Sequence, residues 1–80
     1  MNSTVIVTGA SNGIGRAVAK AFAWNYYNVV IADLDKENGN ALQDELLSEG
    51  RQAQFIYCDV SNPKSIQNLV KEALKRYPNN

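Results

Sequence analysis

The sequence has no histidine, a single cysteine and no excess of either charge. With no histidine to activate it, Cys58 is expected to be a small buried hydrophobe and not a nucleophile. One cysteine cannot form an internal disulfide, which fits a reducing cytoplasm. The eight basic and eight acidic residues cancel, so the composition gives no sign of attraction to nucleic acid or to an anionic membrane.

Long apolar runs are also missing. No stretch approaches the ~20 apolar residues that span a bilayer. The first predicted strand starts so close to Met1 that we expect no secretory signal. The chain has 80 residues, fewer than the ~100–200 of an average domain, so residues 1–80 are expected to form one small domain.

The stretch from Thr4 to Val18 organises the chain. Thr4 to Thr8 is a β-branched run that favours a strand, and the lack of polar side chains from Val5 to Val7 predicts burial on both faces, as in a parallel sheet. Glycines follow at positions 9, 13 and 15, and a helical pattern begins directly after them. This arrangement suits phosphate binding, because free backbone N–H groups and the helix dipole attract the anion.

A β-hairpin is the alternative for this stretch, since Asn12-Gly13 is a favoured type I′ turn pair. A hairpin needs a second alternating strand after the turn. Instead, apolar residues recur at the helical spacing i, i+4, i+7 and i+8, namely Ile14, Val18, Ala21 and Phe22. The pattern therefore favours the phosphate-binding turn.

The rest of the chain repeats the alternation of strand and helix. The predicted elements are a helix from Ile14 to about Tyr26, a strand from Asn28 to Asp33, a helix capped by Asp35 and Gly50, a strand from Ala53 to Asp59, and a helix opened by Asn62-Pro63 and ended by Pro78. The last strand alternates more than the other two, as expected at a sheet edge. With right-handed crossovers, the order predicts an α/β fold with a parallel sheet in the order 3-2-1.

Two helices carry apolar stripes that we expect to face the sheet. In the second helix the inward residues are Leu42 and Leu46. In the third helix the stripe consists of Ile66, Leu69, Val70, Ala73, Leu74 and Tyr77.

The glycine turn resembles that of a known family. The residues Thr8-Gly9-Ala10-Ser11-Asn12-Gly13-Ile14-Gly15 are similar to the Thr-Gly-x-x-x-Gly-Ile-Gly motif of the short-chain dehydrogenase/reductase (SDR) family. Its members are Rossmann-type oxidoreductases that use NAD or NADP. The resemblance implies a three-layer, Rossmann-like βαβαβα fragment, a truncated dinucleotide-binding domain in which the fourth strand and everything after it are missing.

Asp33 is the candidate ribose ligand. It ends the second strand, 33 − 9 = 24 residues after the first glycine. A carboxylate there accepts from both ribose hydroxyls and repels a 2′-phosphate. The resemblance places a basic residue of NADP users at Asn12 or Leu34, which are not basic here. NAD is therefore expected over NADP, although the alternative is that Asp33 merely precedes a loop.

Asp59 and Val60 end the third strand and resemble the Asp-Val pair that holds adenine in the family. The alternative is that Asp59 caps the start of the next helix. The full set of expected cofactor residues is Gly9, Ser11, Asn12, Gly13, Ile14, Gly15, Asp33, Leu34, Asp59 and Val60. Weak binding is expected, because the nicotinamide half of the site is missing. No metal site is expected.

The family's catalytic pair, Tyr-x-x-x-Lys, is absent from the sequence. The fourth residue after Tyr26, Tyr27 and Tyr57 is Val30, Ile31 and Ser61, and the chain ends before that position for Tyr77. The Asn-Asn-Ala-Gly segment and the catalytic serine are missing as well. No catalytic residue is therefore assigned, and the chain is expected to be inactive alone. Whether it is an enzyme stays open, the alternatives being a non-catalytic interaction protein and a nucleotide-binding module without redox chemistry.

The end of the first helix departs from the family pattern. Family members commonly carry glycine at the position of Tyr26, where the helix ends in a left-handed turn. Tyr26 must adopt a positive φ itself, or the helix must end differently, with Asn25 as an alternative left-handed residue. Trp24 is expected on the outer face, either as a lone surface aromatic or as part of a contact patch.

The first strand is expected to lack a neighbour on one side, because the family's fourth strand pairs with it. Thr4 to Thr8 then presents unpaired backbone groups, with no charge or proline to protect the edge. Two-fold pairing of two such strands gives a sheet in the order 3-2-1-1′-2′-3′. The sequence therefore predicts a homodimer through Thr4 to Thr8.

Overall fold

A computed structural model describes residues 2–78 of the chain. Strands and helices alternate along it in the order β1 (Thr4–Thr8), α1 (Gly13–Trp24), β2 (Asn28–Asp33), α2 (Lys36–Ser48), β3 (Ala53–Tyr57) and α3 (Pro63–Arg76). The predicted bounds of β1 and β2 agree with the structure. Helix α1 and strand β3 each end about two residues earlier than their apolar patterns indicated.

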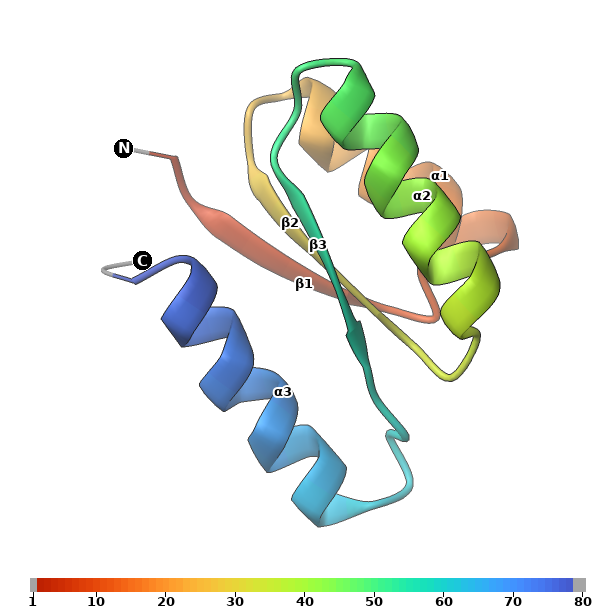
Figure 1. Ribbon diagram of the computed structural model, residues 1–80, viewed down its shortest axis with the longest axis vertical. Helices are drawn as coiled ribbons and strands as arrows, with labels where there is room; N and C mark the ends of the chain where they lie inside the picture. The colour runs from red at the N-terminus through yellow and green to blue at the C-terminus, as the bar shows by residue number, and fades with distance from the viewer. Residues whose placement is uncertain (1, 79–80) are drawn as a thin grey trace.

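The strands form one parallel sheet in the order β1-β2-β3, which confirms the predicted 3-2-1 order and the Rossmann-like α/β fold. Val5 pairs with Val29, and Val29 in turn pairs with Ala53. Helices α1 and α2 cover one face of the sheet and α3 covers the other, as Figure 1 shows. The fold therefore has three layers.

Strand β2 lies at the centre of the core. Its residues from Val29 to Ala32 are at most 1% exposed. On the face covered by α1 and α2 they pack with Ala19, Ala23, Leu42 and Leu46. On the other face they pack with Ile56, Cys58, Leu69, Ala73 and Tyr77. The expected burial of Leu42, Leu46 and Cys58 is confirmed.

The prediction that β1 is buried on both faces is wrong. Ile6 is 38% exposed and Thr8 is also exposed. Among the described residues, β2 is the one strand that pairs with β1. A β-branched apolar run predicts a strand, but it does not determine how many neighbours cover that strand.

Helix α1 ends in a left-handed turn at Tyr26, whose φ is 67°. Asn25 does not take this role, since its φ is −98°, and its side-chain amide donates instead to the carbonyl of Ala21 at 2.7 Å. The guanidinium of Arg51 lies 3.9 Å from the ring centre of Trp24 and 5.0 Å from that of Tyr26. Trp24 is 48% exposed, so it lies on the outer face as expected.

Helix α3 begins as the sequence predicts. Pro63 is its first residue, and the side chain of Asn62 accepts from the N–H of Lys64 at 3.0 Å. Only part of its apolar stripe faces the core. Leu69, Ala73 and Tyr77 are buried, whereas Ile66, Val70 and Leu74 are between 40% and 54% exposed. No helix within residues 2–78 is long and apolar enough to cross a membrane.

Candidate nucleotide-binding site

The turn between β1 and α1 has the backbone of an anion-binding loop. Gly9 and Gly13 have φ values of 65° and 57°, in the left-handed region that favours glycine. The N–H of Gly9 donates to the carbonyl of Ala32 at 2.8 Å, which ties the turn to the end of β2. Within the described chain, the N-cap residue Asn12 makes no side-chain capping bond to α1. The side chain of Asn12 therefore satisfies none of the first N–H groups of α1, the groups that bind anions at helix N-termini in other proteins.

Gly15 lets the first turn of α1 lie directly against the glycine turn. A Cβ at this position would collide with the backbone carbonyl of Gly9 and would approach the Cα of Ala10 to 3.1 Å. Any side chain at Gly15 would push α1 away from β1. The missing side chain at Gly15 therefore permits the close approach of α1 to the glycine turn.

Asp33 lies at the end of β2, and its carboxylate faces the glycine turn. It accepts from the N–H of Ser11 at 3.0 Å through Oδ2, and from the N–H of Leu34 at 2.7 Å and of Asp35 at 3.3 Å through Oδ1. Partial burial works to raise the pKa of Asp33, but the hydrogen bonds from Ser11, Asp35 and Leu34 outweigh it and hold this pKa below its ordinary value. The carboxylate is therefore ionised and fixed in position at neutral pH.

Asp35 joins the glycine turn to the start of α2. Its carboxylate caps α2 by accepting from the N–H of Asn38 at 3.0 Å, as the sequence predicts. It also accepts from the side-chain amides of Asn12 at 3.0 Å and of Asn38 at 2.8 Å. These bonds from Asn38 and Asn12 lower the pKa of Asp35. Asn12 is therefore held by an acidic neighbour, a contact that its place in the motif did not reveal.

The carboxyl ends of the strands frame an open cleft of about 280 Å³ beside the glycine turn. Its lining residues are Thr8, Gly9, Ala32, Asp33, Leu34, Cys58 and Val60. The cleft brings together residues from all three strand ends, so the predicted ligands Gly9, Asp33, Leu34 and Val60 are neighbours in space. Clefts at this position in parallel α/β sheets are the usual place for ligands.

Asp59 does not line this cleft. Its carboxylate accepts from the N–H of Ser61 at 3.0 Å and from the Ser61 hydroxyl at 2.6 Å, and these bonds lower its pKa. The N–H of Asp59 itself donates to the hydroxyl of Ser65 at 2.9 Å. The structure therefore gives Asp59 the role of stabilising the turn into α3, and its contact with adenine stays a prediction.

Gly39 supports the site, a role that its position in the sequence did not reveal. A Cβ at Gly39 would collide with the ring of Phe55 and would lie 3.0 Å from the hydroxyl of Ser11. The missing side chain thus lets α2 approach both β3 and the glycine turn. A glycine inside an otherwise regular helix was the available signal.

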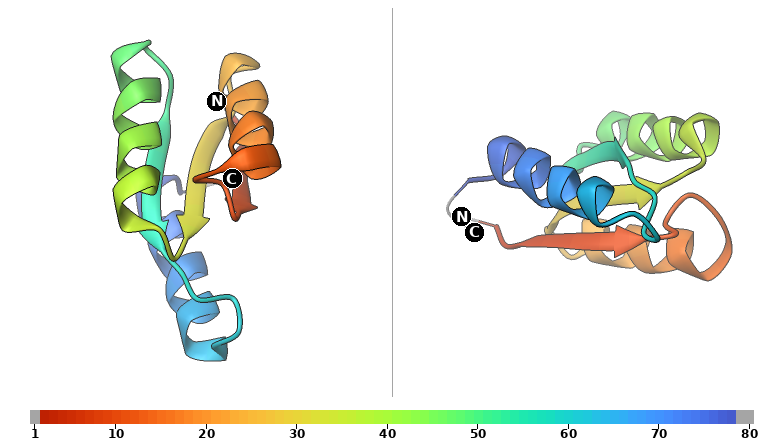
Figure 2. Two further views of the ribbon diagram at one scale, coloured as in Figure 1. Left: turned by 90° about the vertical axis from the view of Figure 1, so that its right-hand side faces the viewer. Right: turned by 90° about the horizontal axis from the view of Figure 1, so that it is seen from below.

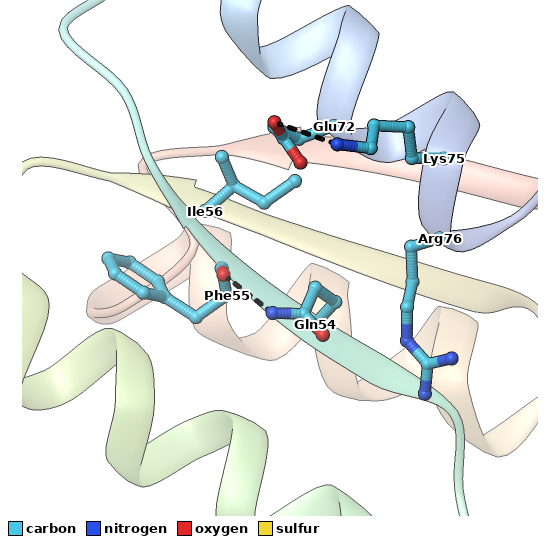
Figure 3. Close-up of a pocket in the computed structure, with 6 residues that line it drawn as sticks. All are labelled: Gln54, Phe55, Ile56, Glu72, Lys75 and Arg76. Atoms are coloured by element: carbon cyan, nitrogen blue, oxygen red, sulfur yellow. Dashed lines mark hydrogen bonds and ion pairs between the residues drawn. The ribbon is translucent and has the colours of Figure 1, made fainter.

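A larger groove of about 460 Å³ lies between β3 and α3, away from the glycine turn (Figure 3). Its lining residues are Gln54, Phe55, Ile56, Glu72, Lys75 and Arg76. Figure 3 shows Phe55 and Ile56 on opposite sides of β3, as strand geometry requires. No candidate cofactor residue lines this groove, so size alone does not identify the site.

The fold and the site define a class of protein: a Rossmann-like parallel α/β fold with a glycine turn at the start of its first helix. The sequence profile of the short chain dehydrogenase family matches residues 3–79. The chain belongs to this family of oxidoreductases.

Individual relatives agree with this assignment. A Thermotoga maritima protein described as an uncharacterized oxidoreductase is 38% identical over 72 residues, which are 90% of this chain and 28% of that protein. The L-fucose dehydrogenase of Oryctolagus cuniculus is 41% identical over 91% of this chain and 24% of its own length. The chain thus spans about a quarter of the length of these relatives.

Solved structures of the family superpose closely. A short chain dehydrogenase/reductase from Burkholderia phymatum, in complex with NAD, has a TM-score of 0.90 and 32% identity over 92% of this chain and 26% of that chain. The hydroxysteroid dehydrogenase from Escherichia coli has a TM-score of 0.89 and 31% identity over 92% of this chain and 31% of its own.

Proposed function

We propose that the chain is the NAD-binding N-terminal part of an SDR-type oxidoreductase. The observation that carries the proposal is the position of Asp33, whose carboxylate lies at the cleft and accepts from the N–H of Ser11 in the glycine turn. One structural relative, the protein from Burkholderia phymatum, holds NAD. We infer that this chain binds the same dinucleotide.

The residues present fit a dinucleotide. The glycine turn offers backbone N–H groups and a site at Gly15 from which any side chain is excluded, which suits a pyrophosphate. The cleft lined by Asp33, Leu34 and Val60 suits an adenosine. The cofactor, when bound, supplies hydride transfer, while the residues of this chain bind and orient it.

The same surroundings favour NAD over NADP. Asp33 and Asp35 are both acidic, and both have lowered pKa values. Asn12 and Leu34, the positions at which NADP users carry a base, offer no positive charge to a 2′-phosphate. The side chain of Asn12 already donates to Asp35, so it is not directed at an anion. A 2′-phosphate would therefore meet net repulsion.

Titration calorimetry with NAD, NADP, ADP-ribose and AMP tests this proposal. We expect weak binding of NAD and ADP-ribose and weaker binding of NADP. The variant Asp33→Asn should bind NAD about tenfold more weakly, a loss of ~1.4 kcal/mol in binding free energy. The difference between its affinities for NAD and NADP should therefore be smaller than in the unmodified chain. Asp44→Asn removes an equal charge from the exposed side of α2 and should bind as the unmodified chain does. Tighter binding of NADP than of NAD would contradict the assignment.

We further propose that residues 1–80 do not turn over substrate by themselves, because no tyrosine among them is followed four positions later by lysine. The purified chain, supplied with NAD and a panel of secondary alcohols, should form no reduced cofactor above background. A steady rate that survives repurification would show that other residues supply the acid–base chemistry. The free, buried Cys58 is compatible with the reducing cytoplasm that we propose as its location.

The second candidate function is association without catalysis. Within residues 2–78, β2 is the one strand beside β1, and Ile6 is 38% exposed; both observations support the homodimer through β1 that the sequence predicts. Nucleotide binding separates the two candidates, since an interaction protein of this fold need not bind NAD, ADP-ribose or AMP.

A further inference from the structure

The N-terminus of α1 differs from those of the other two helices. Asp35 caps α2 by accepting from the N–H of Asn38 at 3.0 Å. Asn62 caps α3 by accepting from the N–H of Lys64, also at 3.0 Å. Asn12 has the same position before α1, but within residues 2–78 its side chain makes no capping bond. The helix without a side-chain cap is therefore the one that follows the glycine turn.

The backbone of Asn12 does not prevent capping. Its φ of −143° and ψ of 159° lie in the extended region that N-cap residues adopt, and its carbonyl accepts from the N–H of Arg16 at 3.2 Å. Asparagine is among the best N-cap residues, and its side-chain oxygen ordinarily accepts from the second or third N–H of the helix. In α1 these donors belong to Ile14 and Gly15. A rotation of the Asn12 side chain would therefore be enough to cap α1.

Two residues at the start of α2 hold this side chain in another direction. Nδ2 of Asn12 donates to Oδ2 of Asp35 at 3.0 Å, and Oδ1 of Asn12 accepts from Nδ2 of Asn38 at 3.3 Å. Nδ2 of Asn38 also donates to Oδ2 of Asp35 at 2.8 Å, which closes a triangle of three side chains. The oxygen that could cap α1 is therefore already engaged by α2.

The surrounding backbone fixes the two ends of this triangle relative to each other. In Figure 2, α1 and α2 both begin at the end of the sheet where β1 and β2 finish. Ser11 is 1% exposed, and its hydroxyl donates to the carbonyl of Asp35 at 3.4 Å. The missing side chain of Gly39 lets α2 lie against this hydroxyl. The triangle therefore connects two segments that already pack together.

A side-chain cap and a bound phosphate use the same N–H groups of a helix. A phosphate that binds at a capped N-terminus must first displace the cap, so its affinity falls by the contribution of the cap. If the capping side chain is held elsewhere before the ligand arrives, this loss is avoided. Such pre-organisation increases affinity without any further contact to the ligand.

We infer that Asp35 and Asn38 are positioning residues that hold the side chain of Asn12 away from the N-terminus of α1 and so keep its N–H groups available to the pyrophosphate of a dinucleotide. The inference rests on the proposed function. It gives these three residues a role that is separate from that of Asp33, the candidate ribose ligand.

Calorimetry with NAD and ADP-ribose tests the inference on a variant that releases Asn12. Asp35→Ser removes the carboxylate but keeps a good N-cap residue on α2, and Asn38→Ala removes the second contact but not the N–H that is capped. We expect this released variant to bind both nucleotides about fivefold more weakly, the effect of a cap that contributes ~1 kcal/mol. Loss of a negative charge beside an anionic ligand acts in the opposite direction, so it does not account for weaker binding.

Removal of the Asn12 side chain provides the decisive comparison. Asn12→Ala in the released variant should restore binding, because no side chain then competes for the N–H groups. A purely structural role of Asp35 and Asn38 predicts no such recovery. Asp44→Ser with Asn40→Ala makes the same two substitutions at exposed positions of α2 and should bind as the unmodified chain does. A loss that Asn12→Ala does not restore would overturn the inference, as would a released variant that binds as tightly as the unmodified chain.

Hydrogen exchange, measured by NMR without nucleotide, tests the position of the Asn12 side chain directly. In the released variant this side chain should cap α1, so the N–H of Ile14 or Gly15 should exchange more slowly than in the unmodified chain. Asn12→Ala in the same background should abolish this protection. Circular dichroism verifies that each variant is folded. If the released variant does not fold, Asp35→Ser alone breaks the bond to Asn12, and the same comparisons apply to it.

The two measurements separate this inference from the proposed function. If the unmodified chain binds neither NAD nor ADP-ribose, the proposed function fails, whereas hydrogen exchange still decides whether Asn12 is held away from α1. If the unmodified chain binds NAD but exchange at Ile14 and Gly15 is equal in the unmodified and released chains, the inference is overturned and the proposed function stands.

Discussion

At Gly15 the backbone of the glycine turn leaves no space for a side chain. Gly15→Ala would bring a Cβ against the carbonyl of Gly9, where backbone and not a flexible side chain must give way. We expect a loss of unfolding free energy of about 1–3 kcal/mol, the usual range for overpacking, together with loss of NAD binding. Urea denaturation and calorimetry measure the two effects. Ala41→Ser, which adds one atom at an exposed site on α2, should change neither.

The lowered pKa values of Asp33 and Asp35 imply a loss of stability in acid. A group whose pKa is lower in the folded than in the unfolded state contributes stability above its unfolded value, and that contribution disappears as the pH falls through the folded value. For these carboxyls the window lies below about pH 4. Urea midpoints measured from pH 7 downward should therefore fall in this window. Asp35→Asn should flatten the fall, whereas Asp44→Asn should leave it unchanged.

The residues of the site differ in how far the sequence could predict them. The spacing of the glycines is local, and Asp33 is marked by its place at the end of a predicted strand, so both positions could be located from the sequence. The bond from Asn12 to Asp35 joins residues 23 positions apart in the sequence. The side-chain bond from Asn38 to Asp35 depends on the rotamers of both residues. Neither bond could be predicted from the sequence. The role of Asp59 in the turn could not be predicted either, because a carboxylate at the end of a strand can accept hydrogen bonds from a ligand or from the following turn.

Among the elements, β3 is protected at its outer edge where β1 is not. The side-chain oxygen of Gln43 in α2 accepts from the N–H of Phe55 at 2.7 Å and so occupies a donor on that edge. Gln43→Met keeps the side-chain length but leaves this N–H without its partner. We expect a loss of about 1 kcal/mol in unfolding free energy and faster hydrogen exchange at Phe55. Gln52→Met, at an exposed position, is the matched control, and unchanged exchange at Phe55 would contradict the role of Gln43.

The periodicity of apolar residues predicted the helices and strands well, but it predicted their burial poorly. The alternation of strands and helices, the caps at Asp35 and Asn62 and the sheet order all follow from local signals and a handedness rule. The burial of β1 did not follow, because burial depends on neighbours that a strand's own sequence does not specify. For the same reason the apolar stripe of α3 predicts a face turned to the core, whereas Ile66, Val70 and Leu74 are between 40% and 54% exposed.

For the whole molecule, small size limits the stability of the fold. A domain of this size buries only about 60% of the surface of its unfolded chain, so it has little stability to spare. If the proposed pairing of two β1 strands covers Ile6, unfolding is coupled to dissociation, and the thermal midpoint must rise with protein concentration. Differential scanning calorimetry over a wide concentration range should show this rise.

Ile6→Lys should abolish the rise in thermal midpoint, because it places a like charge on each of the two β1 strands that we propose to pair. Glu72→Gln, in the groove beside β3, should preserve the rise. A midpoint that does not depend on concentration in the unmodified chain would mean that the monomer is stable with Ile6 exposed. The buried centre formed by β2 would then suffice to hold the fold without a partner.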